Sequence, residues 1–142
     1  MEKTFEKRII LTGNNRTNLL FEQTHLLNGN GFCDLLVTGF GKYAKLEVKE
    51  TFFKSPVVTH VKNIFEKTQI PYYLKCFKQD PNSEIWCIVK NDNRYIIFKI
   101  SLSFCKTISS ITFSTLFLCT TQYLVSENLL DCLLFLERYF NE

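Results

Sequence analysis

The strongest constraint on the fold is a strict alternation of side chains that begins just after Gly41. From residue 44 onward apolar and charged residues alternate, in the order Ala44, Lys45, Leu46, Glu47, Val48 and Lys49. Successive side chains of a β-strand point to opposite faces, so this period of two predicts a strand with one buried face and one solvated face. Glycine tolerates positive φ, and we expect the glycines of Gly39-Phe40-Gly41-Lys42 to turn a preceding strand into this one.

The Gly41-Lys42 pair also invites comparison with a phosphate-binding loop. Such a loop needs the pattern G-x-x-x-x-G-K-[ST] and a helix after it, because its amides, lysine and hydroxyl hold the phosphates and the magnesium ion. In this chain Leu36 stands at the first glycine position, Tyr43 replaces the hydroxyl residue, and a strand is expected to follow. We therefore expect Lys42 to bind no nucleoside triphosphate.

Similar strand-like runs recur along the chain, separated by residues that favour turns. They predict strands at 5–12, 18–27, 32–38, 43–49, 72–78, 85–90 and 95–102, with strand-like alternation again at 111–114. Gly, Asn, Asp and Pro mark turns at 13–15, 28–31, 80–83 and 91–93. Residues 56–69 fit a short helix, although Val57-Val58-Thr59 also suits a strand. The sequence predicts a single α+β domain over residues 1–142, with a mainly antiparallel sheet of meanders and hairpins, a short middle helix and a C-terminal helix.

The last segment, SENLLDCLLFLERYFNE, predicts a helix from about residue 127 with Ser126 as its N-cap. Apolar residues cover most of its surface and leave a narrow polar strip that includes Asp131 and Arg138. A helix that is apolar all round is typically buried between other elements, but part of this surface could instead face another protein chain. Leu134 lies beside the polar strip, so we expect it to point outward while Leu133 points into the core.

Composition and charge narrow the class of protein without naming a partner. The 142 residues carry a formal net charge of +3, well short of the concentrated positive charge typical of nucleic-acid-binding proteins. Charged residues near the N-terminus leave no apolar core for a secretory signal, and polar residues interrupt the uncharged run 107–126 too often for a membrane span. We expect a cytoplasmic protein that makes no membrane contact.

The residues that usually carry catalysis or bind metals are scattered. The six cysteines stand mostly in apolar runs and form no C-x-x-C pair: Cys33, Cys76, Cys87, Cys105, Cys119 and Cys132. Only His25 and His60 could complete a zinc site with them, so we expect buried free thiols, no metal and no cofactor. The histidines and carboxylates form no recognisable nucleophile or acid–base arrangement, and we expect no enzyme activity.

One basic and aromatic segment offers an alternative function. Tyr72, Tyr73, Lys75, Phe77 and Lys78 interleave rings and positive charges within a predicted strand. A single-stranded nucleic-acid-binding sheet uses such residues to stack bases and to neutralise phosphates. The segment lacks the glycines of the RNA-recognition signature, and aromatic residues are ordinary strand formers, so core packing is the favoured interpretation.

The stretch LLVTGFGKYAKLEVKE resembles the first central hairpin of the proteasome assembly chaperone 3 family. In that family an apolar strand runs through a threonine into Phe-Gly-Lys and then into a strand with a leucine four residues after the lysine. The matching positions here are Val37, Thr38, Phe40, Gly41, Lys42 and Leu46. Ala44 stands where the family tends to carry a glycine, and a fainter likeness continues through SPVVTHV and the closing helix.

The resemblance implies a cytosolic, non-enzymatic chaperone with an antiparallel sheet and flanking helices. Such a chaperone pairs with a second small assembly chaperone of similar fold and helps to arrange the proteasome alpha-subunit ring. We accordingly expect the hairpin residues Phe40, Lys42 and Tyr43, together with Leu134 and Arg138 of the last helix, to contact a protein partner.

Overall fold

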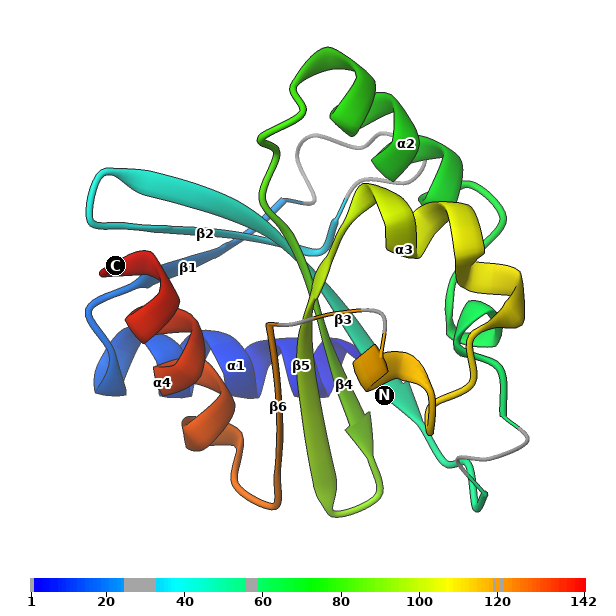
Figure 1. Ribbon diagram of the computed structural model, residues 1–142. Helices are drawn as coiled ribbons and strands as arrows, with labels where there is room; N and C mark the ends of the chain where they lie inside the picture. The colour runs from blue at the N-terminus through cyan, green and yellow to red at the C-terminus, as the bar shows by residue number, and fades with distance from the viewer. Residues whose placement is uncertain (1, 25–32, 56–58, 119, 121) are drawn as a thin grey trace.

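A six-stranded sheet, whose strands lie side by side in chain order, forms the centre of the computed structural model (Figure 1). The structure describes residues 2–24, 33–55, 59–118, 120 and 122–142. The strands are β1 (Leu20–Gln23), β2 (Leu35–Gly39), β3 (Lys42–Thr51), β4 (Ile85–Asn91), β5 (Arg94–Ile100) and β6 (Tyr123–Ser126). All neighbouring strands are antiparallel except β3 and β4, which run parallel. The predicted α+β class with a mainly antiparallel sheet is confirmed.

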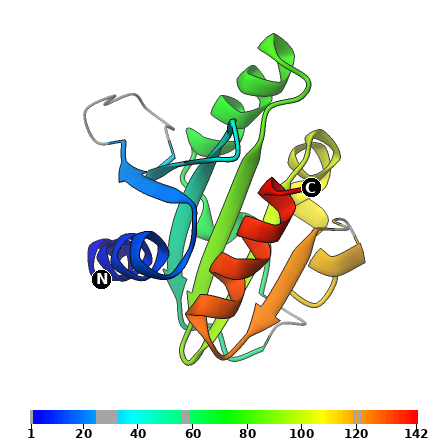
Figure 2. The same ribbon diagram turned by 90° about the vertical axis from the view of Figure 1, so that its left-hand side faces the viewer.

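Helices cover both faces of this sheet (Figures 1 and 2). Helices α1 (Glu2–Arg16) and α4 (Leu129–Phe140) lie on the face that Figure 2 turns toward the viewer, which we call the α4 face. Helices α2 (Gln69–Gln79) and α3 (Leu102–Thr107) lie on the opposite α2 face, together with the short 3-10 segments η2 (Val61–Ile64), η3 (Ile108–Ser110) and η4 (Leu116–Leu118). No helix in the described part of the chain has the length and apolar character needed to cross a membrane.

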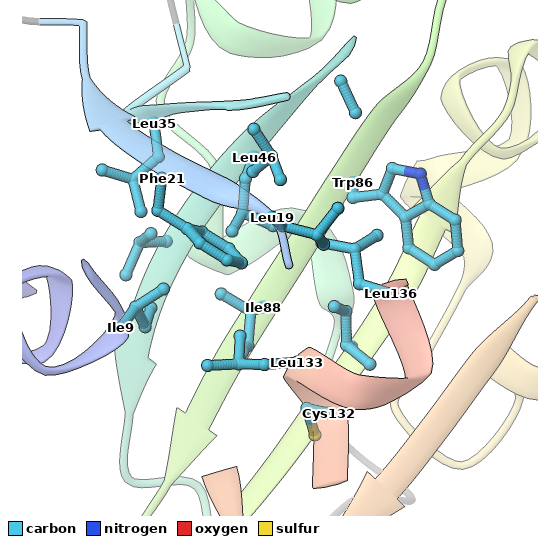
Figure 3. Packing of buried hydrophobic residues seen from close by; sticks show 14 of the residues in the cluster. Ile9, Leu19, Phe21, Leu35, Leu46, Trp86, Ile88, Cys132, Leu133 and Leu136 are labelled. Atoms are coloured by element: carbon cyan, nitrogen blue, oxygen red, sulfur yellow. The ribbon is translucent and has the colours of Figure 1, made fainter. Parts of the chain in front are cut away.

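Each face buries its own hydrophobic cluster. The first cluster lies between the sheet and helices α1 and α4, and includes Ile9 of α1, Leu133 of α4, and Phe21, Leu46 and Trp86 of the strands (Figure 3). Under α2 and α3, alternate residues of β4 and β5 pack against the helices to form the second cluster. A sheet buried on both faces explains why β4 reads as a continuous apolar run rather than as an alternation.

The first predicted strand, 5–12, is wrong, because these residues belong to α1. Phe5 and Ile9 stand four residues apart and are both buried, which is the spacing of one helix face. The predicted turn at 13–15 is also part of this helix. A Cβ on Gly13 would lie 2.4 Å from the Phe21 ring, so this glycine lets the helix approach β1 closely. Asn14 then fixes the approach, since its side chain accepts from the Phe21 amide at 2.7 Å and donates to the Phe21 carbonyl at 3.2 Å.

The predicted strand 72–78 is wrong as well, because this segment forms most of α2. Tyr73, Cys76 and Phe77 are buried at spacings of three and four residues, which fit a helix. Pro71 falls in the first turn, where its missing N–H breaks no intrahelical bond. The middle helix therefore begins later than expected, and within the predicted helix 56–69 the structure gives only η2; residues 56–58 lie outside the described part.

The remaining predictions agree with the structure in part. The strands 32–38, 43–49, 85–90 and 95–102 correspond to β2 to β5, although the last ends at Ile100, where Ser101 caps α3 by accepting from the Phe104 amide at 3.1 Å. The strand 18–27 is reduced to β1, with residues 25–27 outside the described part. The turns at 80–83 and 91–93 are present, the turn at 28–31 is not described, and 111–114 contributes only a single bridge to the chain near His60.

The predicted C-terminal helix is present, but its cap differs. Asn128 is the N-cap, because its side chain accepts from the Leu130 amide at 3.0 Å. Ser126 ends β6 instead, where its hydroxyl accepts from the Asn128 amide and donates to Asp131 at 2.7 Å.

Candidate partner-binding site

The backbone at the tip of the β2–β3 hairpin adopts an uncommon conformation, with positive φ at two successive residues. Gly39 pairs with Lys42, so Phe40 and Gly41 form a two-residue turn, with φ of 52° and 76° respectively. Positive φ at both central residues defines a type I′ turn, which favours Asn or Gly at the first position. A bulky side chain in this left-handed conformation costs about 1 to 2 kcal/mol. Phe40 therefore weakens its own hairpin.

The strained turn lies beside the end of α4 (Figure 1), and aromatic residues at its tip are exposed. Phe40 is 46% exposed and Tyr43 is 60% exposed. Lys42 fixes the position of the tip, since its Nζ donates to the main-chain oxygen of Glu142 at 2.7 Å. A groove of about 450 Å³ lies between the hairpin and the helix end, lined in part by Tyr43 and Tyr139. Predicted partner residues Phe40, Lys42 and Tyr43 thus share one surface.

Leu134 and Arg138 lie on another side of α4, against β6. Leu134 is half-buried and Arg138 is exposed, and both line a groove of about 480 Å³ whose far wall is formed by Leu124 and Val125. Leu133, one position earlier, is fully buried in the core, as the sequence predicts. The structure therefore places Lys42 and Tyr43 in one groove beside α4 and Leu134 and Arg138 in another, while Phe40 lies at the hairpin tip and lines neither.

Part of the apolar surface of α4 is already covered within the chain. Trp86 of β4 packs against two aromatic residues of α4. Its ring centroid lies 6.2 Å from that of Phe135 and 4.9 Å from that of Tyr139. The Tyr139 hydroxyl also accepts from Lys99 at 2.7 Å. The Leu134 side of the helix has no such aromatic cover and is a candidate for contact with another protein, as is the helix end that lines the hairpin groove.

The α2 face contains a buried polar cluster that the sequence does not predict. Glu47 is 1% exposed and Lys49 is 4% exposed, although their alternation with apolar residues indicated a solvated face. Gln69 and Tyr73 of α2 donate to the two oxygens of Glu47 at 2.5 and 3.1 Å. Lys49 donates to Gln69 at 2.9 Å and lies 3.4 Å from Glu47. The predicted half-buried strand is thus wrong on this face, because α2 covers it.

Burial sets the protonation of this cluster. It raises the pKa of Glu47 to about 8, with help from the Asp34 carboxylate and against the lowering effects of Lys49 and Tyr73. Burial likewise raises the pKa of the Tyr73 hydroxyl, which therefore remains a donor. The Glu47 carboxyl group, which accepts hydrogen bonds from Gln69 and Tyr73, stabilises the packing of α2 on β3.

The alternative nucleic-acid residues lie on helix α2 and not on a sheet face. Tyr73 and Phe77 are buried in the core, Lys75 and Lys78 are exposed, and Tyr72 is half-buried with the Lys45 ammonium 5.1 Å from its ring centroid. A basic, aromatic sheet face made of these five residues is therefore wrong.

The remaining chemical groups are ordinary parts of the core. The five cysteines within the described residues, Cys33, Cys76, Cys87, Cys105 and Cys132, are free and buried, and burial raises the pKa of Cys105 and of Cys132 to about 12. Cys119 and His25 lie outside the described part. Among the residues that are described, no three His, Cys, Asp or Glu side chains gather as a metal site. After Lys42 comes the strand β3, as predicted, and not the helix that a phosphate-binding loop requires.

No protein-family model matches the chain, and no curated protein matches it significantly.

Proposed function

We propose that the chain is a non-enzymatic binding protein that holds a protein partner at the tip of the β2–β3 hairpin and along the adjoining surface of α4. The observation that carries this proposal is Phe40. Its backbone is strained and 46% of its surface remains exposed, so the isolated chain gains only part of the burial energy of a phenylalanine at this position. Burial of the remaining surface against a partner would contribute roughly 1 kcal/mol and offset part of the strain.

The neighbouring residues support the same function. Tyr43 adds a second exposed ring, and aromatic residues of this kind are enriched at protein interfaces because they combine a large apolar area with a polar group. Leu134 and Arg138 offer a second contact surface on another side of α4. By the resemblance of the hairpin sequence, the partners are a second small assembly chaperone and proteasome alpha subunits, in the cytoplasm.

Site-specific photo-crosslinking in the native cell tests this proposal. A photoreactive phenylalanine analogue at position 40 should form adducts with discrete proteins, and mass spectrometry should identify proteasome alpha subunits or a small chaperone among them. The matched control is position 11, because Leu11 of α1 is 65% exposed and equally apolar. The binding function is refuted if position 40 gives no adduct or the same adducts as position 11. Adducts with unrelated proteins would retain the binding function and reject the proteasome assignment.

A further inference from the structure

A basic groove runs along α2 on the opposite face of the sheet from α4. Its volume is about 700 Å³, within the range of ordinary ligand sites. Thr68, Tyr72, Lys75 and Gln79 line it at spacings of four, three and four residues, so they form one stripe along the helix. The stripe spans roughly 16 Å at a rise of about 1.5 Å per residue. Lys45 of β3 and Lys67, just before the helix, complete the groove.

The groove concentrates positive charge. Lys45, Lys67 and Lys75 line it, and no Asp or Glu is among the lining residues. Elsewhere in the chain, Lys49, Lys90 and Lys99 each lie within 3.4 Å of a glutamate oxygen. Within the residues that the structure describes, none of the three groove lysines forms such an ion pair.

Lys45 gives the groove a fixed charge. It projects from the central strand β3, and its Nζ lies 3.4 Å from the Cys76 sulfur and 5.1 Å from the centroid of the Tyr72 ring. Burial lowers the pKa of Lys45, but the contacts with Tyr72 and Cys76 outweigh it, so the pKa stands above its ordinary value. The ammonium is therefore charged at neutral pH, while the exposed Lys67 and Lys75 can adjust to a ligand.

Clustered lysines and polar side chains are a chemistry that binds phosphate. The lysine ammonium acts as a compact point charge with three donors, as in the lysine of phosphate-binding loops. The groove offers three lysines and no arginine. Its length exceeds that of a single phosphate, and Thr68, Tyr72 and Gln79 add polar groups that can bond to phosphate oxygens. We propose that this groove binds a ligand that carries two or more phosphate groups, and that it does so independently of the partner surface on α4.

Titration of the whole chain with pyrophosphate, followed by calorimetry and by two-dimensional amide NMR, tests the site. We expect saturable shifts at Thr68, Tyr72 and Gln79, and weaker binding as salt increases. The double variant Lys67→Ala/Lys75→Ala should lower the affinity by at least about tenfold, since each lysine supplies a charge-assisted hydrogen bond. The control is Lys78→Ala, which removes an exposed lysine of the same helix that does not line the groove, and it should bind as the parent does.

The absence of saturable shifts, an equal loss of affinity in Lys78→Ala, or shifts centred on Lys42 of the hairpin would overturn the proposal. A short single-stranded oligonucleotide identifies the source of the phosphates: tighter binding than pyrophosphate, lost in the double variant, assigns them to a nucleic-acid backbone, and weaker binding assigns them to a small molecule. Poly-glutamate that binds this groove as tightly as pyrophosphate would refute the assignment to phosphate. The photo-crosslinks from position 40 should be unchanged in the double variant, so the two proposals fail separately.

Discussion

Strand β3 sends its side chains to both faces of the sheet, where they meet different surroundings. Ala44, Leu46 and Val48 enter the α4 face and join a wholly apolar cluster. Glu47 and Lys49 enter the α2 face and are buried as well, within hydrogen bonds to Gln69 and Tyr73. Helices cover both faces, but the Asp, Glu, Lys or Arg side chains that are buried among the described residues, Glu47 and Lys49, lie on the α2 face and need polar partners there.

This difference extends to the edges of the two faces. At the border of the α4 face, Phe40, Tyr43 and Leu134 leave apolar surface exposed or half-exposed. At the border of the α2 face, Lys45 lies at a groove that it shares with two further lysines. Each edge thus resembles the interior of its face: the edge of the α4 face is apolar, and the edge of the α2 face is polar and basic. We expect the two edges to bind different kinds of ligand.

The largest effect should come from placing a charge in the apolar cluster. Leu133→Glu puts an unpaired carboxylate where Leu133 is fully buried, so we expect a loss of at least about 3 kcal/mol in the free energy of unfolding. Leu134→Glu, on the half-buried side of the same helix, should lower it by less than about 1 kcal/mol while weakening partner capture. Chemical denaturation and crosslinking yield measure the two effects. Equal unfolding by both variants would show that α4 is core on all sides.

A smaller effect should follow from titration of the α2 face. Because the pKa of Glu47 is raised to about 8 in the folded chain, the folded state retains a proton that the unfolded state has already lost. Its contribution to stability is complete below the ordinary pKa of about 4.5, declines as pH rises toward 8, and is absent above that.

Glu47→Gln keeps the side-chain length and a carbonyl acceptor but cannot titrate, so it should remove this pH dependence. Urea unfolding at several pH values between about 5 and 8 compares the variant with the parent chain. A slope that survives in the variant would assign the pH dependence to groups other than Glu47.

The extent to which the sequence predicts the fold depends on how local each signal is. Strands β2 to β5 are predictable because alternating or continuous apolar runs lie within a few residues of tight turns. The helix α1 is not, because Gly13 and Asn14 are typical turn residues whose actual role is contact with Phe21 on another element. The helix α2 is missed because its aromatic residues also suit a strand.

The same reasoning explains what could be predicted of the candidate sites. The turn at Gly41 and the outward direction of Leu134 follow from local spacing. The left-handed conformation of Phe40 depends on the pairing of Gly39 with Lys42, which fixes a two-residue turn. The burial of Glu47 and the basic groove both depend on α2, so neither could be predicted once 72–78 was interpreted as a strand.

The most direct test of the proposed function is Phe40→Asn, because stability and binding should move in opposite directions. Asparagine suits the first position of a type I′ turn, so the variant should be more stable than the parent by about 1 kcal/mol in chemical denaturation. Loss of the ring should at the same time reduce co-purification of the crosslinked partner. Asp92→Asn is the matched control, since Asp92 of the β4–β5 hairpin also has positive φ, 56°, and should change neither property appreciably. A Phe40→Asn variant that is less stable and still captures the partner would contradict the account.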